Sequence, residues 1–310
     1  MASRGKKRGK SRKKKIKLRT LALALLVGGG LLFTVLSLFL LSDRPPKPVT
    51  RDERSSRTVS PKKQNSNGEQ GARRLQKKEL NATHKEEVSE GLPKVAIIID
   101  DVGFDVELAR SFLDLKSSLT FSVLPTAPYA QAIAREALGK GAEVMLHLPM
   151  EPKESNGGGP GAGALLVKMG EAEFLETLNG YLSRIPGVKG VNNHMGSLLT
   201  EKEDKMVLLF RELKKRHLFF VDSRTTPHTV ASRVAADMKV PVASRSVFLD
   251  HDLSQEAMRA QWDRIPGLAR EQGYAVAIAH PHRETLMFLK EHLQDLIDSA
   301  RLVRVADIVS

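Results

Sequence analysis

Short apolar runs alternate with amphipathic segments from Pro93 to the C-terminus, and this alternation constrains the fold more than any other feature. Such alternation is typical of βα units that build a largely parallel sheet. The predicted strands are 94–100, 119–124, 143–147, 190–193, 218–222, 240–243, 275–280 and 302–305. The predicted helices are 106–116, 129–140, 171–184, 203–216, 230–238, 254–272 and 283–299. Seven or eight βα units in one stretch favour an α/β fold with a closed or nearly closed barrel, and a doubly wound sheet is the alternative.

Charge is divided unevenly along the chain. Residues 1–20 carry 11 Lys or Arg and no acid, and residues 42–91 carry 12 basic and 8 acidic residues. The remaining 26 basic and 28 acidic residues all lie after residue 91, so the net charge of +13 belongs to the N-terminal part. A nucleic-acid-binding domain needs a basic patch on its own surface, so we expect no nucleic-acid partner.

Residues 21–41 form an uncharged apolar run of 21 residues. At about 1.5 Å per residue, a helix of this length crosses a hydrocarbon core of roughly 30 Å. The basic tail, residues 1–20, is expected to stay in the cytoplasm. This predicts a single-pass inner-membrane anchor with the domain on the periplasmic side. A cleavable signal peptide is the rival, but it has a shorter apolar core and a small-residue cleavage site, which the run lacks.

Residues 42–91 are rich in Pro, Ser, Asn, Gln and charge, with almost no apolar periodicity. Such a segment cannot bury enough apolar surface to offset the entropy lost on ordering. We therefore interpret it as a disordered linker between the membrane anchor and a domain spanning residues 92–310.

Polar side chains gather where the predicted strands end. These residues are Asp100, Asp101, His147, His194, Asp222, Ser223, His280 and His282. In a parallel barrel the C-terminal ends of the strands converge on the face that carries active sites. Imidazole nitrogen and carboxylate oxygen are ligands for a divalent metal of the zinc class, and the remaining groups could act as acid and base.

Each of these residues also has a structural interpretation. A single Asp at a strand end is often a helix N-cap, and the cluster that begins with Asp222 and Ser223 fits a cap as well as a site. Asp100 and Asp101 are harder to explain as two caps, because neighbouring side chains on a strand point to opposite faces and like charges repel. A plain surface position is the interpretation for His217, His228, His251 and His292.

Six motifs occur in order over almost the whole domain: AIIIDDVG, SVLPTAPYA, EVMLHLPMEP, GVNNHMGS, FFVDSRTT and AIAHPH. In these motifs the chain resembles the divergent polysaccharide deacetylase family, a relative of the NodB-type carbohydrate esterases. The resemblance implies a distorted (β/α) barrel of about seven units. It also implies metal-dependent hydrolysis of an N-acetyl group on a sugar, with zinc as the expected metal and N-acetylated polysaccharide or peptidoglycan as the expected substrate.

The resemblance also implies roles for individual residues. Asp100 corresponds to the general base, Asp101 and His147 to metal ligands, and His280 to the general acid that protonates the leaving amine. His282 would support His280. Asp222 would orient and tune one of the histidines, as carboxylates commonly do around metal sites.

The sequence departs from the family pattern after His147. Typical deacetylases carry a second ligand histidine four residues later, and Glu151 stands at that position. His194 is our candidate for the missing ligand, with Glu151 as the alternative. The Gly-rich loop 151–164 indicates a mobile flap near the site or a plain disordered insertion. The expected substrate contacts are Asn193, Ser223, Arg224 and His282.

Three functions remain open at this point. The first is an active metal-dependent deacetylase, which hydrolyses a C–N amide bond on envelope glycan. The second is a catalytically inactive carbohydrate-binding or envelope scaffold protein with the same fold. The third is a hydrolase that acts on another bond, because a fold does not fix the reaction.

Overall fold

The computed structural model describes residues 91–154, 159–161 and 163–309. The predicted cytoplasmic tail, the membrane anchor at 21–41 and the linker up to residue 90 lie outside these ranges. Within them, no helix combines the length and the apolar character needed to cross a membrane.

In the described part of the chain, nine strands form one parallel sheet, one more than the eight strands predicted from the sequence. They are β1 (Lys94–Val102), β2 (Leu119–Val123), β3 (Glu143–Met150), β4 (Gly190–Met195), β5 (Phe219–Asp222), β6 (Val242–Ser244), β7 (Val247–Phe248), β8 (Tyr274–Ala279) and β9 (Arg301–Leu302). The strand order is β6-β5-β4-β3-β2-β1-β8-β7, with β9 beside β1. Of the strand predicted at 302–305, only Leu302 lies in a strand, the two-residue β9, and the short β7 was not predicted.

The two ends of the sheet, β6 and β7, are joined by only Arg245 and Ser246. Three steps of 3.8 Å span at most about 11 Å, so the sheet must curl until its ends approach. The backbone N–H of Arg245 donates to Asp222 O at the end of β5, and that of Ser246 donates to Val276 O in β8. No ladder joins β6 to β7 within the described residues. The fold is therefore an incomplete parallel barrel rather than a doubly wound sheet.

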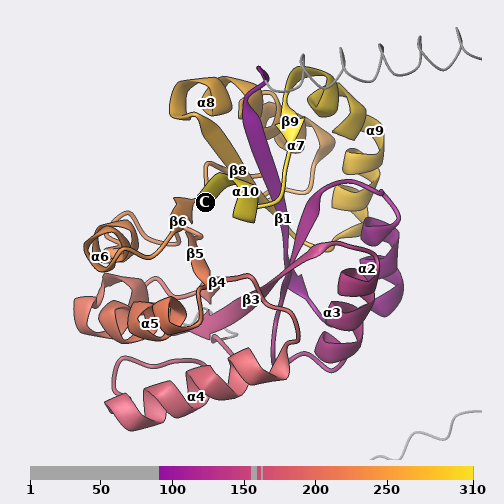
Figure 1. The fold of residues 1–310 in the computed structure, drawn as a ribbon. Helices are drawn as coiled ribbons and strands as arrows, with labels where there is room; N and C mark the ends of the chain where they lie inside the picture. The colour runs from indigo at the N-terminus through magenta and orange to yellow at the C-terminus, as the bar shows by residue number, and fades with distance from the viewer. Residues whose placement is uncertain (1–90, 155–158, 162, 310) are drawn as a thin grey trace, which may run out of the picture. The chain divides into compact units, whose positions relative to one another are not determined.

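Helices surround the outside of this curled sheet (Figure 1). They are α2 (Val106–Leu113), α3 (Ala130–Gly139), α4 (Glu171–Arg184), α5 (Glu203–Lys215), α6 (Ala231–Met238), α7 (Gln255–Trp262), α8 (Ile265–Gln272) and α9 (Arg283–Ser299). A 3-10 turn, η1 (Leu199–Glu201), and a short C-terminal helix, α10 (Ala306–Val309), complete the chain. The single helix predicted at 254–272 is wrong. It is divided into α7 and α8 because Pro266 fits a first helical turn but not a helix interior.

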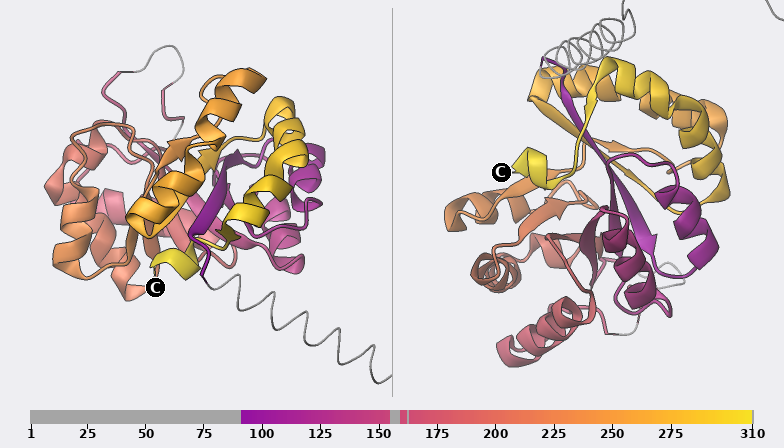
Figure 2. Two further views of the ribbon diagram at one scale, coloured as in Figure 1. Left: turned by 90° about the horizontal axis from the view of Figure 1, so that it is seen from above. Right: turned by 45° about the vertical axis from the view of Figure 1, so that its right-hand side comes forward.

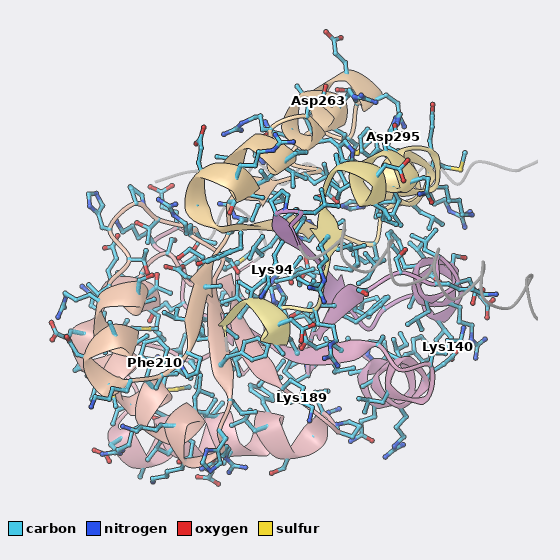
Figure 3. All side chains as sticks on the ribbon, turned by 45° about the horizontal axis from the view of Figure 1, so that its top comes forward. Lys94, Lys140, Lys189, Phe210, Asp263 and Asp295 are labelled. Atoms are coloured by element: carbon cyan, nitrogen blue, oxygen red, sulfur yellow. The ribbon has the colours of Figure 1, made fainter. Side chains whose placement is uncertain are left out.

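Side chains alternate between two apolar clusters. On β1, Val95, Ile97 and Ile99 pack outward against the helices, whereas Ala96 and Ile98 face the barrel interior. In the outer cluster Phe210 of α5, labelled in Figure 3, packs edge to face on Phe220 of β5 at 5.3 Å between ring centroids. Because side chains on a strand alternate between its two faces, the next inward-facing residue of β1 after Ile98 is Asp100. The same alternation brings polar residues into the interior at the C-terminal ends of the strands.

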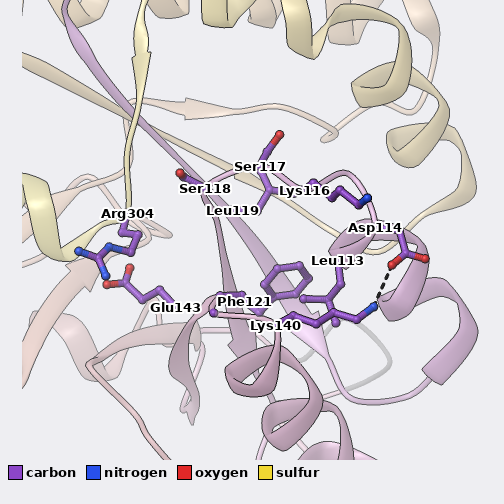
Figure 4. A pocket seen from close by; sticks show the side chains of 12 residues that line it. Leu113, Asp114, Lys116, Ser117, Ser118, Leu119, Phe121, Lys140, Glu143 and Arg304 are labelled. Carbon is purple, nitrogen blue, oxygen red and sulfur yellow. Dashed lines mark hydrogen bonds and ion pairs between the residues drawn. The ribbon is translucent and has the colours of Figure 1, made fainter. Parts of the chain in front are cut away.

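The N-terminal end of the barrel is closed by α10 (Figure 2). Ile308 and Val309 pack against the inner cluster, and Glu143, at the start of β3, anchors the helix. The Glu143 carboxylate accepts from Val305 N (2.8 Å), from Ala306 N (3.1 Å) and from the hydroxyl of Thr120 (2.8 Å). A cavity of about 520 Å³ lies beside this carboxylate (Figure 4).

Candidate functional site

Inward-facing polar side chains occupy the opposite end of the barrel, where the strands finish. His147 on β3 and Asn192 on β4 are directly paired across the ladder, and His194 lies two residues further along the same face of β4. Asp100 follows Ile99, which pairs with Ala279 immediately before His280. Parallel pairing thus brings together residues that are far apart in the sequence.

The two adjacent aspartates both reach this interior because β1 is irregular at its end. The β1–β2 register shifts between Ile99 and Val102, and Asp101 adopts a left-handed backbone conformation with φ 54°. A non-glycine residue in this region costs about 1 kcal/mol or more, and such strain is concentrated at functional sites. The irregularity lets both carboxylates approach His147, which lies 3.7 Å from Asp100 Oδ1 and 3.2 Å from Asp101 Oδ1.

Three ligand-type atoms converge on one point. Asp101 Oδ1 lies 2.8 Å from His194 Nδ1 and 3.2 Å from His147 Nε2, and the two nitrogens are 3.2 Å apart. Asp101 Oδ1 is buried and has no hydrogen-bond partner in the described ranges. A zinc ion with bonds of about 2.0–2.1 Å holds tetrahedral ligands roughly 3.3 Å apart. Asp101, His147 and His194 therefore fit the ligands of one divalent metal, and we call these three residues the metal-ligand set.

Asn192 fixes the chemical state of the neighbouring groups. Its amide nitrogen donates to both oxygens of Asp100, at 2.8 and 3.0 Å. Its Oδ1 therefore faces His147 Nδ1 at 2.9 Å, and Ser122 donates to the same oxygen. Since an amide oxygen only accepts, His147 Nδ1 must carry the proton. When His147 is neutral, its lone pair therefore lies on Nε2, the atom that faces Asp101 and His194.

Burial and charge shift the pKa values of these groups. Burial raises the pKa of Asp100, and the charges of His147 and His280 offset only part of that rise. Burial alone would lower the pKa of His147, but Asp100 and Asp101 raise it to about 9. Contacts with the two histidines likewise outweigh burial and hold the pKa of Asp101 well below its usual range. A metal must therefore displace a proton from His147, so metal affinity rises with pH.

His280 at the end of β8 is held by a buried carboxylate that sequence reasoning missed. Asp250 accepts from His280 Nδ1 at 2.9 Å, from His280 N at 2.6 Å and from the hydroxyl of Thr285 at 2.8 Å. Burial alone would lower the pKa of His280, but the hydrogen bond to Asp250 and the charge of Asp100 raise it. The imidazole is thereby kept protonated to higher pH, with Nε2 left for the cavity.

Two cavities meet at these residues. One, of about 430 Å³, is lined by Asp100, Asp101, His147, Asn193, His194, Met195, Ser223, Arg224, Thr225, Arg245, Phe248, His251, Ile278 and His280. The other, of about 400 Å³, shares Asp101, His194 and His280 with the first and adds Phe104 and His282. Asp101, His194 and His280 therefore line both cavities, whereas His147 lines only the larger one.

The remaining predicted contacts lie around this centre. Asn193 ties strand ends together, since its Oδ1 accepts from Ser223 N (2.9 Å) and its amide donates to Met195 O (2.7 Å). Ser223 Oγ lies 3.5 Å from the Asn192 amide, and Arg224 lines the larger of the two site cavities. The structure thus places these three residues beside the metal-ligand set, whereas their roles toward a substrate stay predictions.

Two predicted residues lie away from the converging atoms. Asp222 Oδ1 accepts from Arg224 N at 2.8 Å, and in the described part of the chain Asp222 has no hydrogen bond to a histidine. Asp250 provides the carboxylate that we expected from Asp222. The Glu151 carboxylate accepts from Val167 N at 2.6 Å and is not in the metal-ligand set. His194, our candidate for the missing ligand, lies in this set, and its role as a ligand stays a prediction.

Sequence reasoning missed four residues of the site: Asn192, Arg245, Asp250 and His251. Asp250 follows β7, which is too short to show a strand pattern, although it ends an apolar run as the other site residues do. His251 lines the larger site cavity, where we had expected a plain surface position. Asn192 could have been found from its place two residues before His194 on one strand face.

Comparisons with known proteins agree with the sequence motifs. Residues 97–309 match the family described as divergent polysaccharide deacetylase. Uncharacterized protein YibQ of Escherichia coli K12 is 33% identical over 222 residues, which cover 70% of this chain and 67% of the relative. An uncharacterized protein of Haemophilus influenzae is 32% identical over 69% of this chain and 76% of its own length.

A solved structure shares the fold. Uncharacterized protein ATU2773 from Agrobacterium tumefaciens C58 superposes with a TM-score of 0.67 at 21% sequence identity, over 70% of this chain and 89% of that one. The family match covers most of the chain and includes every residue of the metal-ligand set. The resemblance expected from the six motifs is confirmed, and this chain belongs to the divergent polysaccharide deacetylase family.

Proposed function

We propose that this protein is a metal-dependent hydrolase that removes acetyl groups from N-acetylated sugars of an envelope glycan. The observation that carries the proposal is the convergence of Asp101, His147 and His194 beside Asp100 and His280 on one cavity. Three metal ligands, a carboxylate outside that set and an imidazole backed by a carboxylate are the groups that hydrolysis of an amide needs.

The ligand set fits zinc, which we propose as the metal. Two imidazole nitrogens and one carboxylate oxygen are ligands of catalytic zinc sites, where a fourth position stays open for water or substrate. When bound there, a divalent ion supplies an activated water and polarises the carbonyl of the acyl group.

Asp100 is the proposed general base. Its carboxylate lies beside His147 but outside the ligand set, and Asn192 holds both of its oxygens in a fixed orientation. Its raised pKa makes it a better proton acceptor than an ordinary aspartate.

His280 is the proposed general acid toward the amine that leaves. It lines the same cavity as Asp100, and Asp250 both orients its ring and raises its pKa. An imidazolium kept protonated in this way can donate its proton as the C–N bond breaks. The base and the acid thus come from two neighbouring strands, β1 and β8.

The location of the reaction is also a proposal. The apolar run 21–41 and the basic tail before it support an inner-membrane anchor with a periplasmic domain. The linker 42–91 would let the domain reach glycan away from the bilayer. N-acetylated polysaccharide or peptidoglycan is the substrate class that this location and the family support.

The test is acetate release by the full chain, loaded with zinc, from acetylated chito-oligosaccharides and peptidoglycan fragments. We expect release by the native chain, and its loss in Asp100→Asn and His280→Asn. The control is His217→Asn, because His217 is exposed at the start of β5, far along the strand from the site. Zinc binding without acetate release from any glycan would support the inactive carbohydrate-binding or scaffold function instead.

A further inference from the structure

Two arginines line the larger site cavity, which otherwise holds the metal ligands and the proposed base. Arg224 follows β5, and Arg245 lies in the link between β6 and β7. In the described part of the chain neither guanidinium forms an ion pair, and Arg245 hydrogen-bonds only to backbone carbonyls. Arg245 is half-buried and Arg224 is exposed, and guanidinium groups without an ion-pair partner are suited to binding an anionic group from outside.

Arg245 is rigidly held. Its Nε donates to Ser223 O at 2.7 Å, its Nη2 donates to Arg224 O at 3.1 Å, and its guanidinium carbon lies 5.2 Å from the ring centroid of Phe248. Nη1 has no hydrogen-bond partner among the described residues. A guanidinium fixed on three sides loses little rotamer entropy when it binds a carboxylate.

Arg224 is presented to the same cavity by a strained turn. Its backbone is left-handed, with φ 49°, and the buried carboxylate of Asp222 accepts its N–H at 2.8 Å. Burial lowers the pKa of Arg245, and the nearby positive charge of Arg224 lowers it further. The fold thus holds two mutually repelling cations together, at a cost that an anionic ligand would relieve.

The net charge of the residues around the cavity also favours an anionic ligand. Asp100, Asp101 and the nearby buried Asp222 carry three negative charges against two positive charges on Arg224 and Arg245, so a divalent ion would leave an excess of one positive charge. The volume of about 430 Å³ lies within the range of small-molecule sites. A neutral sugar would leave this excess charge uncompensated in a half-buried space.

We propose that the cavity takes an N-acetylated sugar that also carries a carboxylate, with the acyl group at Asp101, His147 and His194 and the carboxylate on Arg245 and Arg224. This inference rests on the deacetylase function proposed above and adds the class of substrate. The site would prefer acidic amino-sugar glycans over neutral ones, with the arginines as the residues that determine specificity.

The test compares two matched probes by calorimetric titration of the zinc-loaded full chain. One is a disaccharide of N-acetylglucosamine and N-acetylmuramic acid, which carries a carboxylate, and the other is neutral diacetylchitobiose. We expect the acidic probe to bind at least about tenfold more tightly, as for one charge-assisted bidentate contact. The ratio should fall toward one in Arg224→Gln and Arg245→Gln, and stay at the native value in Arg270→Gln, which removes an exposed charge from α8.

Zinc content and thermal unfolding of each variant show whether it folds. Arg224→Gln alone suffices if Arg245→Gln does not fold, because the Arg224 side chain is exposed. Equal binding of both probes by the native chain would overturn the inference, and acetate released from the neutral probe would then leave the proposed function standing. No acetate from either probe would overturn the proposed function, while the ratio of affinities would still decide the inference.

Discussion

Two buried carboxylates, one at each end of the barrel, differ in how their oxygens are satisfied. Glu143 at the N-terminal end accepts three hydrogen bonds and fastens α10 over the inner cluster. Asp101 at the C-terminal end keeps one buried oxygen without a hydrogen bond, facing two imidazole nitrogens. Buried polar groups are nearly always satisfied, so stability explains the first carboxylate. Asp222 Oδ2 is also buried without a hydrogen bond, so the feature that distinguishes Asp101 is its convergence with the two imidazole nitrogens.

Left-handed backbone conformations also separate the site from the rest of the fold. Non-glycine residues with left-handed φ occur in two settings in the described part of the chain. Some follow helices, where this conformation is an ordinary way to end a helix. They are Lys116, His217 and Lys239. The others lie at or just beyond the C-terminal ends of strands β1, β4 and β5 and line the site. They are Asp101, Met195 and Arg224. Strain without a helix end to explain it is concentrated where the chemistry is proposed.

The largest expected effect is the loss of activity in Asp100→Asn. Removing a general base lowers turnover by about 10²- to 10⁴-fold, whereas zinc content should not change because Asp100 is outside the ligand set. Steady-state acetate release and metal analysis on the same preparation check both parts. Loss of zinc together with activity would show that the two aspartates do not have separate roles.

Glu143→Ala tests whether the N-terminal end of the barrel contributes to stability and not to the metal site. It leaves the N–H groups of Val305 and Ala306 unsatisfied, so we expect the free energy of unfolding in urea to fall by about 3 kcal/mol. Zinc affinity should be retained below the unfolding transition. Glu271→Ala, on the exposed face of α8, is the control and should have little effect on stability. A stably folded Glu143→Ala variant that binds zinc more weakly would contradict the claim that the two ends of the barrel have separate roles.

Asn192→Ala tests whether Asn192, which contacts both the proposed base Asp100 and the proposed metal ligand His147, supports metal binding. Asn192 bonds Asp100 on one side and the ring of His147 on the other, and loss of such a partner weakens metal binding by about 10- to 100-fold. Competition with a chelator measures this change. Asn179→Ala, on α4, is the matched control. Unchanged zinc affinity in Asn192→Ala would mean that His147 is oriented without it.

The smallest expected effect is a shift in the pH profile of Asp250→Asn. The reaction needs protonated His280, whose pKa is raised by the hydrogen bond to Asp250 and by nearby negative charge. Removing that carboxylate lowers the pKa, so the alkaline limb of the activity profile should move down by about one pH unit. Thr285→Val removes only a hydroxyl that bonds Asp250 and should shift the limb less. A shift to higher pH would exclude His280 as the acid.

Most of the fold was predictable because helices and strands alternate regularly after Pro93. Periodicity placed the long strands and the site residues that end them, including His147, His194 and His280. It did not reveal β7, since two residues show no period, and therefore Asp250 was missed. The break between α7 and α8 was also missed, although Pro266 marks it.

The geometry of the site depends on features that no sequence pattern encodes. Adjacent aspartates should point to opposite faces of a strand, and only the register shift and the left-handed Asp101 bring both to the interior. The choice between His194 and Glu151 depended on strand pairing, which aligns β3 and β4 so that His194 reaches the ring of His147. Arg245 is part of the site because it lies where the two ends of the sheet meet.

The central claim is that Asp101, His147 and His194 hold a metal. It is tested most directly by zinc titration of the full native chain beside Asp101→Ala, His194→Ala and Glu151→Gln. We predict stoichiometric zinc in the native chain and in Glu151→Gln, which keeps an acceptor for Val167 N. We predict its loss in Asp101→Ala and His194→Ala. A native chain that binds no zinc, or an Asp101→Ala variant that binds it as well as the native chain, would contradict the claim.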